Sequence, residues 1–313
     1  MIRTLRLTDV VAYLAFRNRA ALNEALLQPE DTPSTPSLRS SFLGRSFELG
    51  RQSWVHLDHG QLDGLVAARP RMGGDVWDVD QLIVLPAAEA STVYRELLGH
   101  LVVAARDEGV QKVFLRVRSD SPVQLAARRA GFFEYTHELI YRLGEVARRP
   151  GAPALPFRPR CRVDHHAVFQ LYSAVVPCQV REVEGMTLQE WRLADGWGFR
   201  PTDLRVGLSP RRRDFVLERE GKVVIWLYVD SKGRRLHLLA HPTESSEVTR
   251  AALHYGLAQL RSDGPVTCAV RAYQPLLAGV LDGEGFALGA EHALLGQSLA
   301  VRLPKRQFVP ARA

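Results

Sequence analysis

The sequence predicts an α/β protein built from two tandem copies of one unit, each a mixed, mostly antiparallel sheet flanked by helices. The chain has 313 residues, and at about 100–200 residues per domain this length favours two domains. One order of strand and helix signals occurs twice along the chain. The glycines and prolines that bound these signals recur at similar spacings, which an internal duplication predicts.

Composition restricts the class of protein. With 46% hydrophobic and 24% charged residues, the chain has the make-up of an ordinary globular protein. It contains no apolar run of the roughly 20 residues that a membrane helix needs, and its mixed polar start, Met1 to Asp9, is not a signal peptide. Three widely spaced cysteines favour neither a disulfide framework nor a metal site. We therefore expect a cytoplasmic protein without a metal.

The net charge is +7, and most of the basic residues are arginines. Arginine forms bidentate contacts with phosphate, so an acidic ligand such as a nucleotide or a nucleic acid is compatible with this charge. A general bias toward arginine explains the same composition without a ligand. The run Arg211-Arg212-Arg213 has two matching interpretations, a phosphate contact or a solvated loop before a strand. A nucleic-acid partner is therefore not expected.

In the first unit, turn residues separate short apolar runs. The turn Asp58-His59-Gly60 joins two strands. The long helix that follows the third strand has apolar residues four apart from Val93 to Ala105, and Gly109 ends it. The predicted elements are strands at 52–57, 62–68 and 76–85, a helix at 91–108, a strand at 113–117, a helix at 122–131 and a strand at 133–143.

The second unit repeats this order. Ala130-Gly131-Phe132 of the first unit has its counterpart in Glu284-Gly285-Phe286, and the opening Leu5 to Asp9 resembles Cys161 to Asp164. Both openings lead into a helix with an N-cap residue. The predicted elements are strands at 215–218, 223–229 and 235–240, a helix from 246 to about 264, a strand at 266–270, a helix from 275 to 285 and a strand at 294–303.

The boundary between the units falls in a segment rich in proline, with the sequence Arg-Arg-Pro-Gly-Ala-Pro-Ala-Leu-Pro, which predicts a semi-rigid linker. The first unit then spans 1–146, the linker 147–157 and the second unit 158–303. Residues 304–313 form a short basic tail. We expect the two units to pack together as a pseudo-dimer within a monomeric chain.

The repeated order of elements, with its closing Gly-Phe, resembles the GNAT superfamily of acyl-CoA-dependent N-acyltransferases. The resemblance covers nearly the whole chain, once in each half. It implies a sheet that opens between its fourth and fifth strands, with acetyl-CoA as co-substrate in that split. A crevice where a sheet divides is also a physically favourable place for a ligand. The resemblance implies main-chain contacts with the cofactor from Ile83, Val84 and Leu85, or from Leu238, Leu239 and Ala240.

In the family, a loop of pattern Arg/Gln-x-x-Gly-x-Gly/Ala precedes the third helix and binds the pyrophosphate. The first half has Glu89 to Tyr94 at this place, so a carboxylate and a bulky ring replace the favourable residues. The second half has Ser245 to Arg250, which also lacks glycine but offers hydroxyls and a guanidinium. The implied contacts are Thr92, Val93 and Tyr94, or Ser246, Thr249 and Arg250. A capped helix without a ligand is the alternative for both halves.

The tyrosine that protonates the departing thiolate in the family is replaced by Ala127 in the first half and by Leu281 in the second. Asp78 and Asp80 are the candidate catalytic bases. They are two apart on the presumed fourth strand, so we expect both on one face with Leu82 and Val84, where one pKa would be raised. A solvated strand end is the alternative explanation. The second half offers only His237 near that place.

The resemblance therefore implies transfer of an acyl group, in the first instance acetyl, from acyl-CoA to a primary amine of a small molecule or peptide. The eroded loop and the missing tyrosines favour an alternative, a non-catalytic scaffold or binding protein that has lost the cofactor. The sequence leaves open which of the two splits binds acetyl-CoA.

Overall fold

The structure of the protein is a computed structural model, which describes residues 1–19, 22–28, 33, 50–71, 74–86, 89–144, 155–185, 212–231, 233–260 and 264–300. The first half contains β1 (Ile2–Thr4), α1 (Val10–Arg17), β2 (Gln52–Asp58), β3 (Gln61–Pro70), β4 (Val76–Val84), α3 (Ala90–Asp107), β5 (Lys112–Arg118), α4 (Val123–Arg129) and β6 (Phe133–Leu143). The second half contains β7 (Arg158–Pro159), α5 (His165–Val175), α6 (Cys178–Glu184), β8 (Arg212–Arg219), β9 (Lys222–Asp230), β10 (Arg235–Ala240), α8 (Ser246–Gln259), β11 (Val266–Arg271), α9 (Pro275–Gly283) and β12 (Ala287–Ser298).

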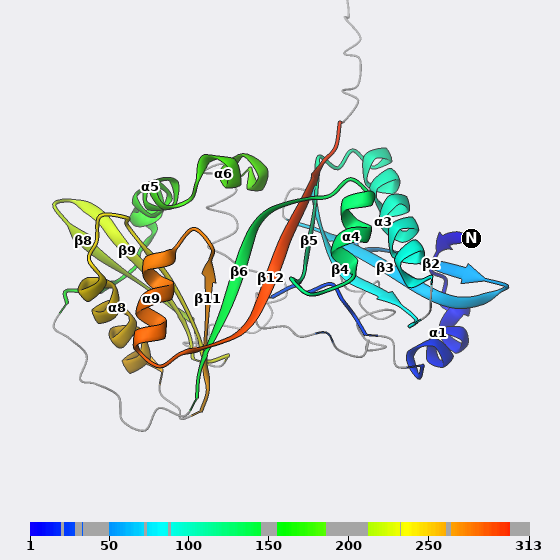
Figure 1. The fold of residues 1–313 in the computed structure, drawn as a ribbon. Helices are drawn as coiled ribbons and strands as arrows, with labels where there is room; N and C mark the ends of the chain where they lie inside the picture. The colour runs from blue at the N-terminus through cyan, green and yellow to red at the C-terminus, as the bar shows by residue number, and fades with distance from the viewer. Residues whose placement is uncertain are drawn as a thin grey trace, which may run out of the picture.

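The two halves share one mixed sheet, which has twelve strands in the described part of the chain. Its order is β1-β2-β3-β4-β5-β12-β6-β11-β10-β9-β8-β7 (Figure 1). The closing strand of each half is therefore exchanged. β12 of the second half pairs antiparallel with β5 of the first, and β6 of the first half pairs antiparallel with β11 of the second.

Most predicted elements agree with the structure, but α8 ends at Gln259 rather than near 264, and the last strand differs. The last strand was expected at 294–303, but it is Ala287–Ser298, so this prediction is wrong. The start of β12 lacks apolar alternation, and its pairing begins at Ala287 opposite Arg142 of β6, so a distant strand rather than local pattern defines it. The unit boundaries stay predictions. Most of the linker 147–157 and all of the tail 304–313 lie outside the described residues.

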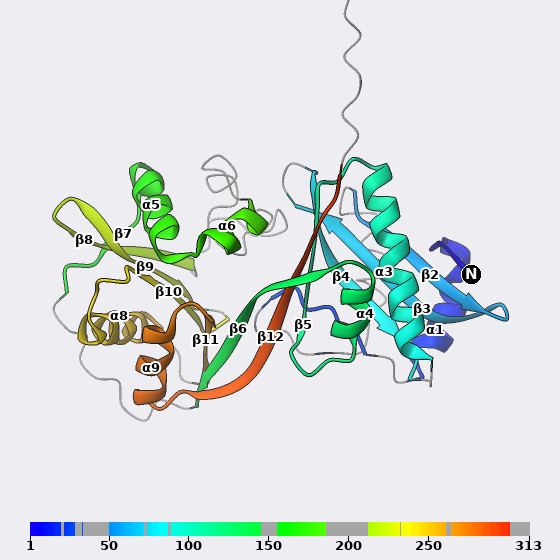
Figure 2. The ribbon, with the colours of Figure 1, turned by 45° about the horizontal axis from the view of Figure 1, so that its top comes forward.

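Helices cover both faces of the sheet (Figure 2). One face packs α3 and α4 in the first half and α8 and α9 in the second, over apolar cores that include Leu97 and Leu253. The opposite face packs α1 in the first half, through Tyr13 and Phe16, and α5 in the second, through Tyr172. This second face also carries polar side chains at the middle of the sheet, where the halves meet.

The duplication repeats individual contacts. Arg3 forms a bidentate ion pair with Asp9, at 2.7 Å for both contacts, and the amide of Arg6 donates to the same carboxylate. In the second half Arg158 pairs with Asp164 at 2.7 and 2.8 Å, and the amide of Cys161 takes the place of Arg6. Each half thus fixes the entry to its first helix by the same bonds.

Among the described residues, no helix has the length and apolar character that crossing a membrane requires.

Candidate functional site

Each half has a split between two parallel strands. β4 and β5 pair only where Val76 to Asp78 lie beside Lys112 to Phe114. β10 and β11 pair only at Arg235 and Leu236. Beyond these residues the parallel strands are no longer hydrogen-bonded to each other, so main-chain groups of both strands face the opening.

The first split is filled by the chain itself. Asn23 lies in an antiparallel bridge with Ile83 of β4. Its side-chain oxygen accepts from the amide of Leu82 at 2.8 Å, and the amide of Glu24 donates to the carbonyl of Leu82 at 2.9 Å. On the other side, the amide of Leu26 donates to the carbonyl of Arg116 at 2.9 Å. A pantetheine chain therefore cannot reach these groups unless this segment leaves.

The predicted contacts Ile83, Val84 and Leu85 do not all face the first split. Ile83 pairs with Leu65 of β3, and the amide of Leu85 donates to the carbonyl of Asp63 at 2.9 Å. Their main chains belong to the β3–β4 ladder. Of the three, Val84 has the same orientation as Leu82, toward the split, because main-chain groups alternate along a strand.

Among the described residues, the side chain of Gln274 bridges the second split. The amide nitrogen of Gln274 donates to the carbonyl of Leu238 at 3.1 Å, and its oxygen accepts from the amide of Arg271 at 3.2 Å. A side chain can rotate away at the cost of about 1 kcal/mol per hydrogen bond, whereas the first split would require a main-chain segment to move. The described residues, which do not include 186–211, place no main-chain segment in the second split comparable to the one around Asn23. Of the three predicted contacts, Leu238 and Ala240 share the orientation toward this split, because main-chain groups alternate along a strand, whereas those of Leu239 point toward β9.

The two phosphate loops differ. In the first half, Thr92 is exposed, Val93 packs beside Gly64, and the ring of Tyr94 lies buried in the core under α3. In the second half, Ser245 caps α8 by accepting from the amide of Val248 at 3.3 Å.

Of the three predicted contacts in the second loop, Thr249 is buried, and its hydroxyl donates to the carbonyl of Ser245 at 3.0 Å. The first turn of the helix thus uses the proton of this hydroxyl, and its contact with phosphate stays a prediction. Arg250 lies 3.0 Å from Glu284, and Ser246 is exposed at the helix start. Of the three residues, Ser246 is thus the best placed to contact a phosphate group.

Both candidate bases form ion pairs with arginines. Asp78 accepts from Arg71 at 2.7–3.0 Å. Burial raises the pKa of Asp78, but Arg71 more than offsets this and the pKa lies below its usual value. The expected rise in pKa is therefore wrong for Asp78. Asp80 lies 2.7 Å from Arg51, and both side chains are buried.

The expected common face is also wrong. The β3–β4 ladder has an irregularity at Asp80, where Ala67 pairs with Gln81 and Ala68 with Val79. This bulge reverses the alternation of β4. Leu82 and Val84 consequently pack under α3, in the same core as Trp77 and Val79. The catalytic roles of Asp78 and Asp80 stay predictions.

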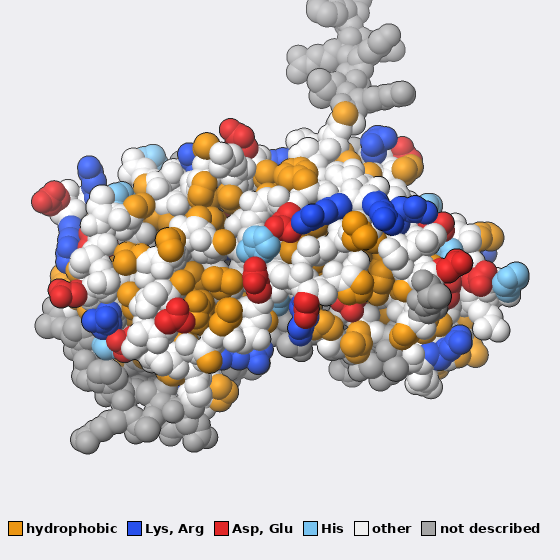
Figure 3. Space-filling view, in the orientation of Figure 1, with side chains coloured by type: hydrophobic (Ala, Val, Ile, Leu, Met, Phe, Trp, Pro, Cys, Tyr) orange, Lys and Arg blue, Asp and Glu red, His pale blue; other side chains and the backbone are white. Residues whose placement is uncertain are grey.

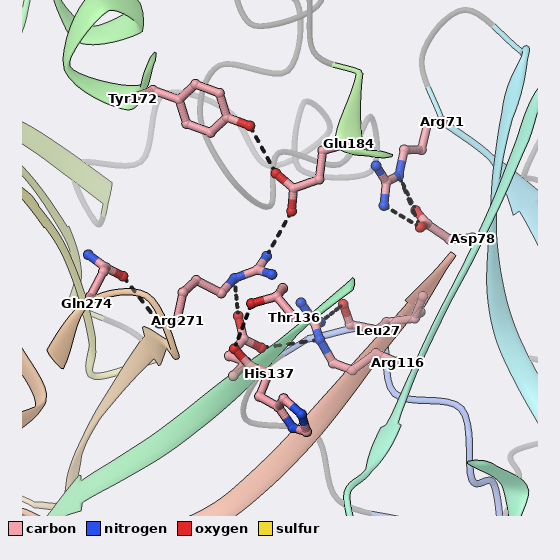
Figure 4. A network of polar contacts seen from close by, with 11 residues as sticks. Leu27, Arg71, Asp78, Arg116, Thr136, His137, Tyr172, Glu184, Arg271 and Gln274 are labelled. Carbon is pink, nitrogen blue, oxygen red and sulfur yellow. Dashed lines mark hydrogen bonds and ion pairs between the residues drawn. The ribbon is translucent and has the colours of Figure 1, made fainter. Parts of the chain in front are cut away.

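The middle of the sheet contains a buried ionic network that the sequence analysis missed (Figure 4). Glu138 of β6 lies 3.2 Å from Arg116 of β5 and 3.2 Å from Arg271 of β11. Burial raises the pKa of Glu138, but the two guanidinium groups outweigh it and the pKa is lowered. These three residues come from both halves and meet because the closing strands are exchanged, so no local motif indicates the network.

The network reaches the mouth of the second split. Arg271 ends β11, three residues before Gln274, and its Nη2 lies 3.5 Å from Glu184 of α6. The hydroxyl of Tyr172 on α5 donates to the other carboxylate oxygen of Glu184 at 3.0 Å. Figure 4 shows Glu184 between Tyr172 and Arg271. The sequence analysis gave Glu184 no role, and its only local signal is a helix end before Gly185.

His237 of β10 lies close to the same network. Its ring meets Trp226 edge-on at 5.7 Å. Burial lowers its pKa to about 4, with Arg271 acting in the same direction and Glu138 opposing. The imidazole is therefore neutral at pH 7. The second split thus has a carboxylate, a guanidinium and a neutral imidazole near its mouth.

Solved structures of acetyltransferases have the same fold. A GCN5-related N-acetyltransferase from Sphaerobacter thermophilus is 14% identical, with a TM-score of 0.58 and 97% of each chain covered. A tandem GNAT protein from the clavulanic acid biosynthesis pathway is 16% identical, with a TM-score of 0.51, and the likeness covers 97% of this chain and 99% of that one. No family model and no curated protein sequence matches the chain. The chain therefore has the fold of the GNAT N-acetyltransferases, in the tandem form that places two such units in one polypeptide.

Proposed function

We propose that the chain is an N-acetyltransferase that transfers an acetyl group from acetyl-CoA to a primary amine, and that the reaction takes place in the split between β10 and β11. The observation that carries the proposal is the contrast between the two splits. In the described part of the chain, main chain fills the first split, while the side chain of Gln274 bridges the second. The GNAT fold supports acetyl transfer as the class of reaction.

Residues of the second half then have distinct tasks. The N-terminus of α8, which begins at Ser246, faces the phosphates with its partial positive charge. The carbonyl of Leu238 hydrogen-bonds the bound co-substrate once Gln274 rotates away. The amine nitrogen attacks the thioester carbonyl of acetyl-CoA, and Glu184 takes the proton of the amine. The C–S bond breaks, and the CoA thiolate leaves and takes a proton from water. Arg271 and Tyr172 hold the carboxylate of Glu184 in place.

Asp78 and Asp80 remain the proposed bases if the first split is used instead. Each of them is paired with an arginine, as Glu184 is with Arg271, so this contact does not distinguish the candidate bases; the choice follows from the choice of split. When the second split is used, the first half serves as its structural partner. We propose that the two halves form a pseudo-dimer within one cytoplasmic monomer. The amine belongs to a small molecule or a peptide in this proposal.

The distribution of surface charge is relevant to a nucleic-acid partner. On the face shown in Figure 3, acidic side chains lie among the basic ones. That face adds no argument for nucleic-acid binding, which depends on a basic patch or stripe.

Calorimetric titration of acetyl-CoA tests the proposal, with two matched variants. Ser246→Glu puts a carboxylate at the first residue of α8, and Ala90→Glu does so at the first residue of α3. Acidic residues stabilise helix N-termini, and Ser246 is exposed. Ala90 packs partly against the core, so thermal denaturation first establishes that Ala90→Glu is folded. We expect Ser246→Glu to weaken binding about tenfold, since one opposed charge near phosphate is worth about 1.4 kcal/mol. Ala90→Glu should leave it unchanged.

The alternative function, a scaffold that has lost the co-substrate, also has specific support. Gln274 occupies the carbonyl of Leu238, and the Thr249 hydroxyl and Arg250 are engaged within the protein. This alternative predicts no heat from acetyl-CoA up to millimolar concentration. Weakening by Ala90→Glu alone would instead move the reaction to the first split.

A further inference from the structure

The first half reaches into the proposed site of the second half through Lys112. This lysine begins β5, yet its Nζ donates to the carbonyls of Glu182 and Val183 on α6, at 2.9 and 2.8 Å. These carbonyls belong to the last turn of the helix, where no intrahelical donor is left. A cation at a helix C-terminus is also favoured by the helix dipole.

Helix α6 depends on such contacts because it is short. It has seven residues, Cys178–Glu184, and helices of this length are not stable by themselves. It ends at Gly185, which has the left-handed conformation with φ 59°. A Cβ atom at this position would collide with the Nζ of Lys112. The glycine therefore allows both the turn and the close approach of the lysine.

The last residue of α6 is Glu184, the proposed base. Its carboxylate is 93% buried, and it contacts Tyr172 and Arg271. Arg271 is held in turn by Glu138 of the first half. Two residues of the first half, Lys112 and Glu138, thus support the two charged groups at the mouth of the second split. Figure 2 shows α6 above the middle of the sheet, between the two halves.

We infer that Lys112 is a positioning residue for the acceptor side of the second split, so that the reaction site is completed by the half whose own split is filled. The inference rests on the proposed function. It requires that loss of the Lys112 contacts displaces Glu184 while the binding surface for acetyl-CoA, on α8 and β10, stays intact. The amine and the co-substrate should therefore respond differently.

Two variants of the intact chain disturb the same contact. Lys112→Met removes the donor and decides the inference. Gly185→Ala displaces the lysine without removing its charge, and it also strains the left-handed turn that ends α6. The matched control is Lys222→Met, an exposed lysine at the start of β9. Three quantities are measured: hydrogen exchange of amides 178–185, acetyl-CoA affinity by calorimetry, and the KM for the amine.

We expect both variants to accelerate exchange in α6 about tenfold and to raise the KM for the amine about fivefold, in line with the loss of charge-assisted hydrogen bonds. Acetyl-CoA affinity should stay within about twofold, and the control should change nothing. Unchanged exchange in α6 overturns the inference, whatever the activity. Faster exchange with an unchanged KM for the amine also overturns it, since Lys112 is then structural only. If the wild-type chain binds no acetyl-CoA, the proposed function is wrong, and this result is distinct from the two outcomes that concern Lys112.

Discussion

The imidazole of His237 is a buried base whose protonation the fold opposes. Its pKa of about 4 lies below the unfolded value of about 6.5. Between these values the unfolded chain binds a proton that the folded chain excludes, so stability falls as the pH drops from about 6.5 to 4. We expect the wild type to lose about 3 kcal/mol more than His237→Gln over this range. Urea denaturation at pH 7, 5 and 4 measures this, with the exposed His59→Gln as control.

Asp164 contributes a pH dependence of the same sign, at lower pH. Its side chain is buried and accepts from Arg158 and from the amide of Cys161, and its pKa lies well below the usual value, chiefly because of the Arg158 bond. The carboxylate therefore stabilises the fold above about pH 4, and this contribution is lost as the pH falls further. Asp164→Asn should cost about 2 kcal/mol at pH 7. The difference should shrink toward pH 2 in thermal denaturation, and Asp120→Asn, in an exposed pair, should show little effect.

Single residues were predicted less well than elements. Simple alternation placed Asp78 and Asp80 on a face with Leu82 and Val84, but one bulged residue reversed the later part of the strand. A bulge has no reliable signature in one sequence. The contact between Glu138 and Arg271 could not be predicted from the sequence, because it depends on which strands pair.

At the scale of elements, the positions of glycine and proline residues predicted most boundaries of helices and strands. β6 was predicted at 133–143 and is Phe133–Leu143, and β10 was predicted at 235–240 and is Arg235–Ala240. Local pattern decides whether a strand forms. It does not decide which neighbour the strand takes, so the exchange of β6 and β12 was not predicted.

The segment around Asn23 forms hydrogen bonds with the facing edges of β4 and β5, at Leu82 and Arg116. Asn23→Leu removes the acceptor for the amide of Leu82 and the donor for the carbonyl of Asp80. Leaving such groups unpaired should cost about 1–2 kcal/mol, which thermal denaturation measures against Asn18→Leu, an exposed control. Acetyl-CoA affinity should not change if the second split binds it. A gain in affinity would instead identify this segment as a competitor for the first split.

At the scale of the whole molecule, the strand exchange makes each half incomplete without the other. Removing the second half takes β12 from between β5 and β6, and removing the first takes β6 from between β11 and β12. Either fragment would expose unpaired strand edges and apolar side chains such as Leu115 and Leu295, which are now buried. This arrangement explains why a half with a filled split is retained.

Division of the chain between residues 144 and 155 tests this dependence. We expect fragments 1–144 and 155–313, expressed separately, to aggregate or to lack a cooperative unfolding transition, because each lacks a central strand. Expressed together, they should form a 1:1 complex that unfolds in a single transition near that of the intact chain. Size-exclusion chromatography with light scattering and calorimetry distinguish these states. A fragment 1–144 that is monomeric and unfolds cooperatively would show that its sheet closes without β12, and the two halves would then be independent domains that only share an edge.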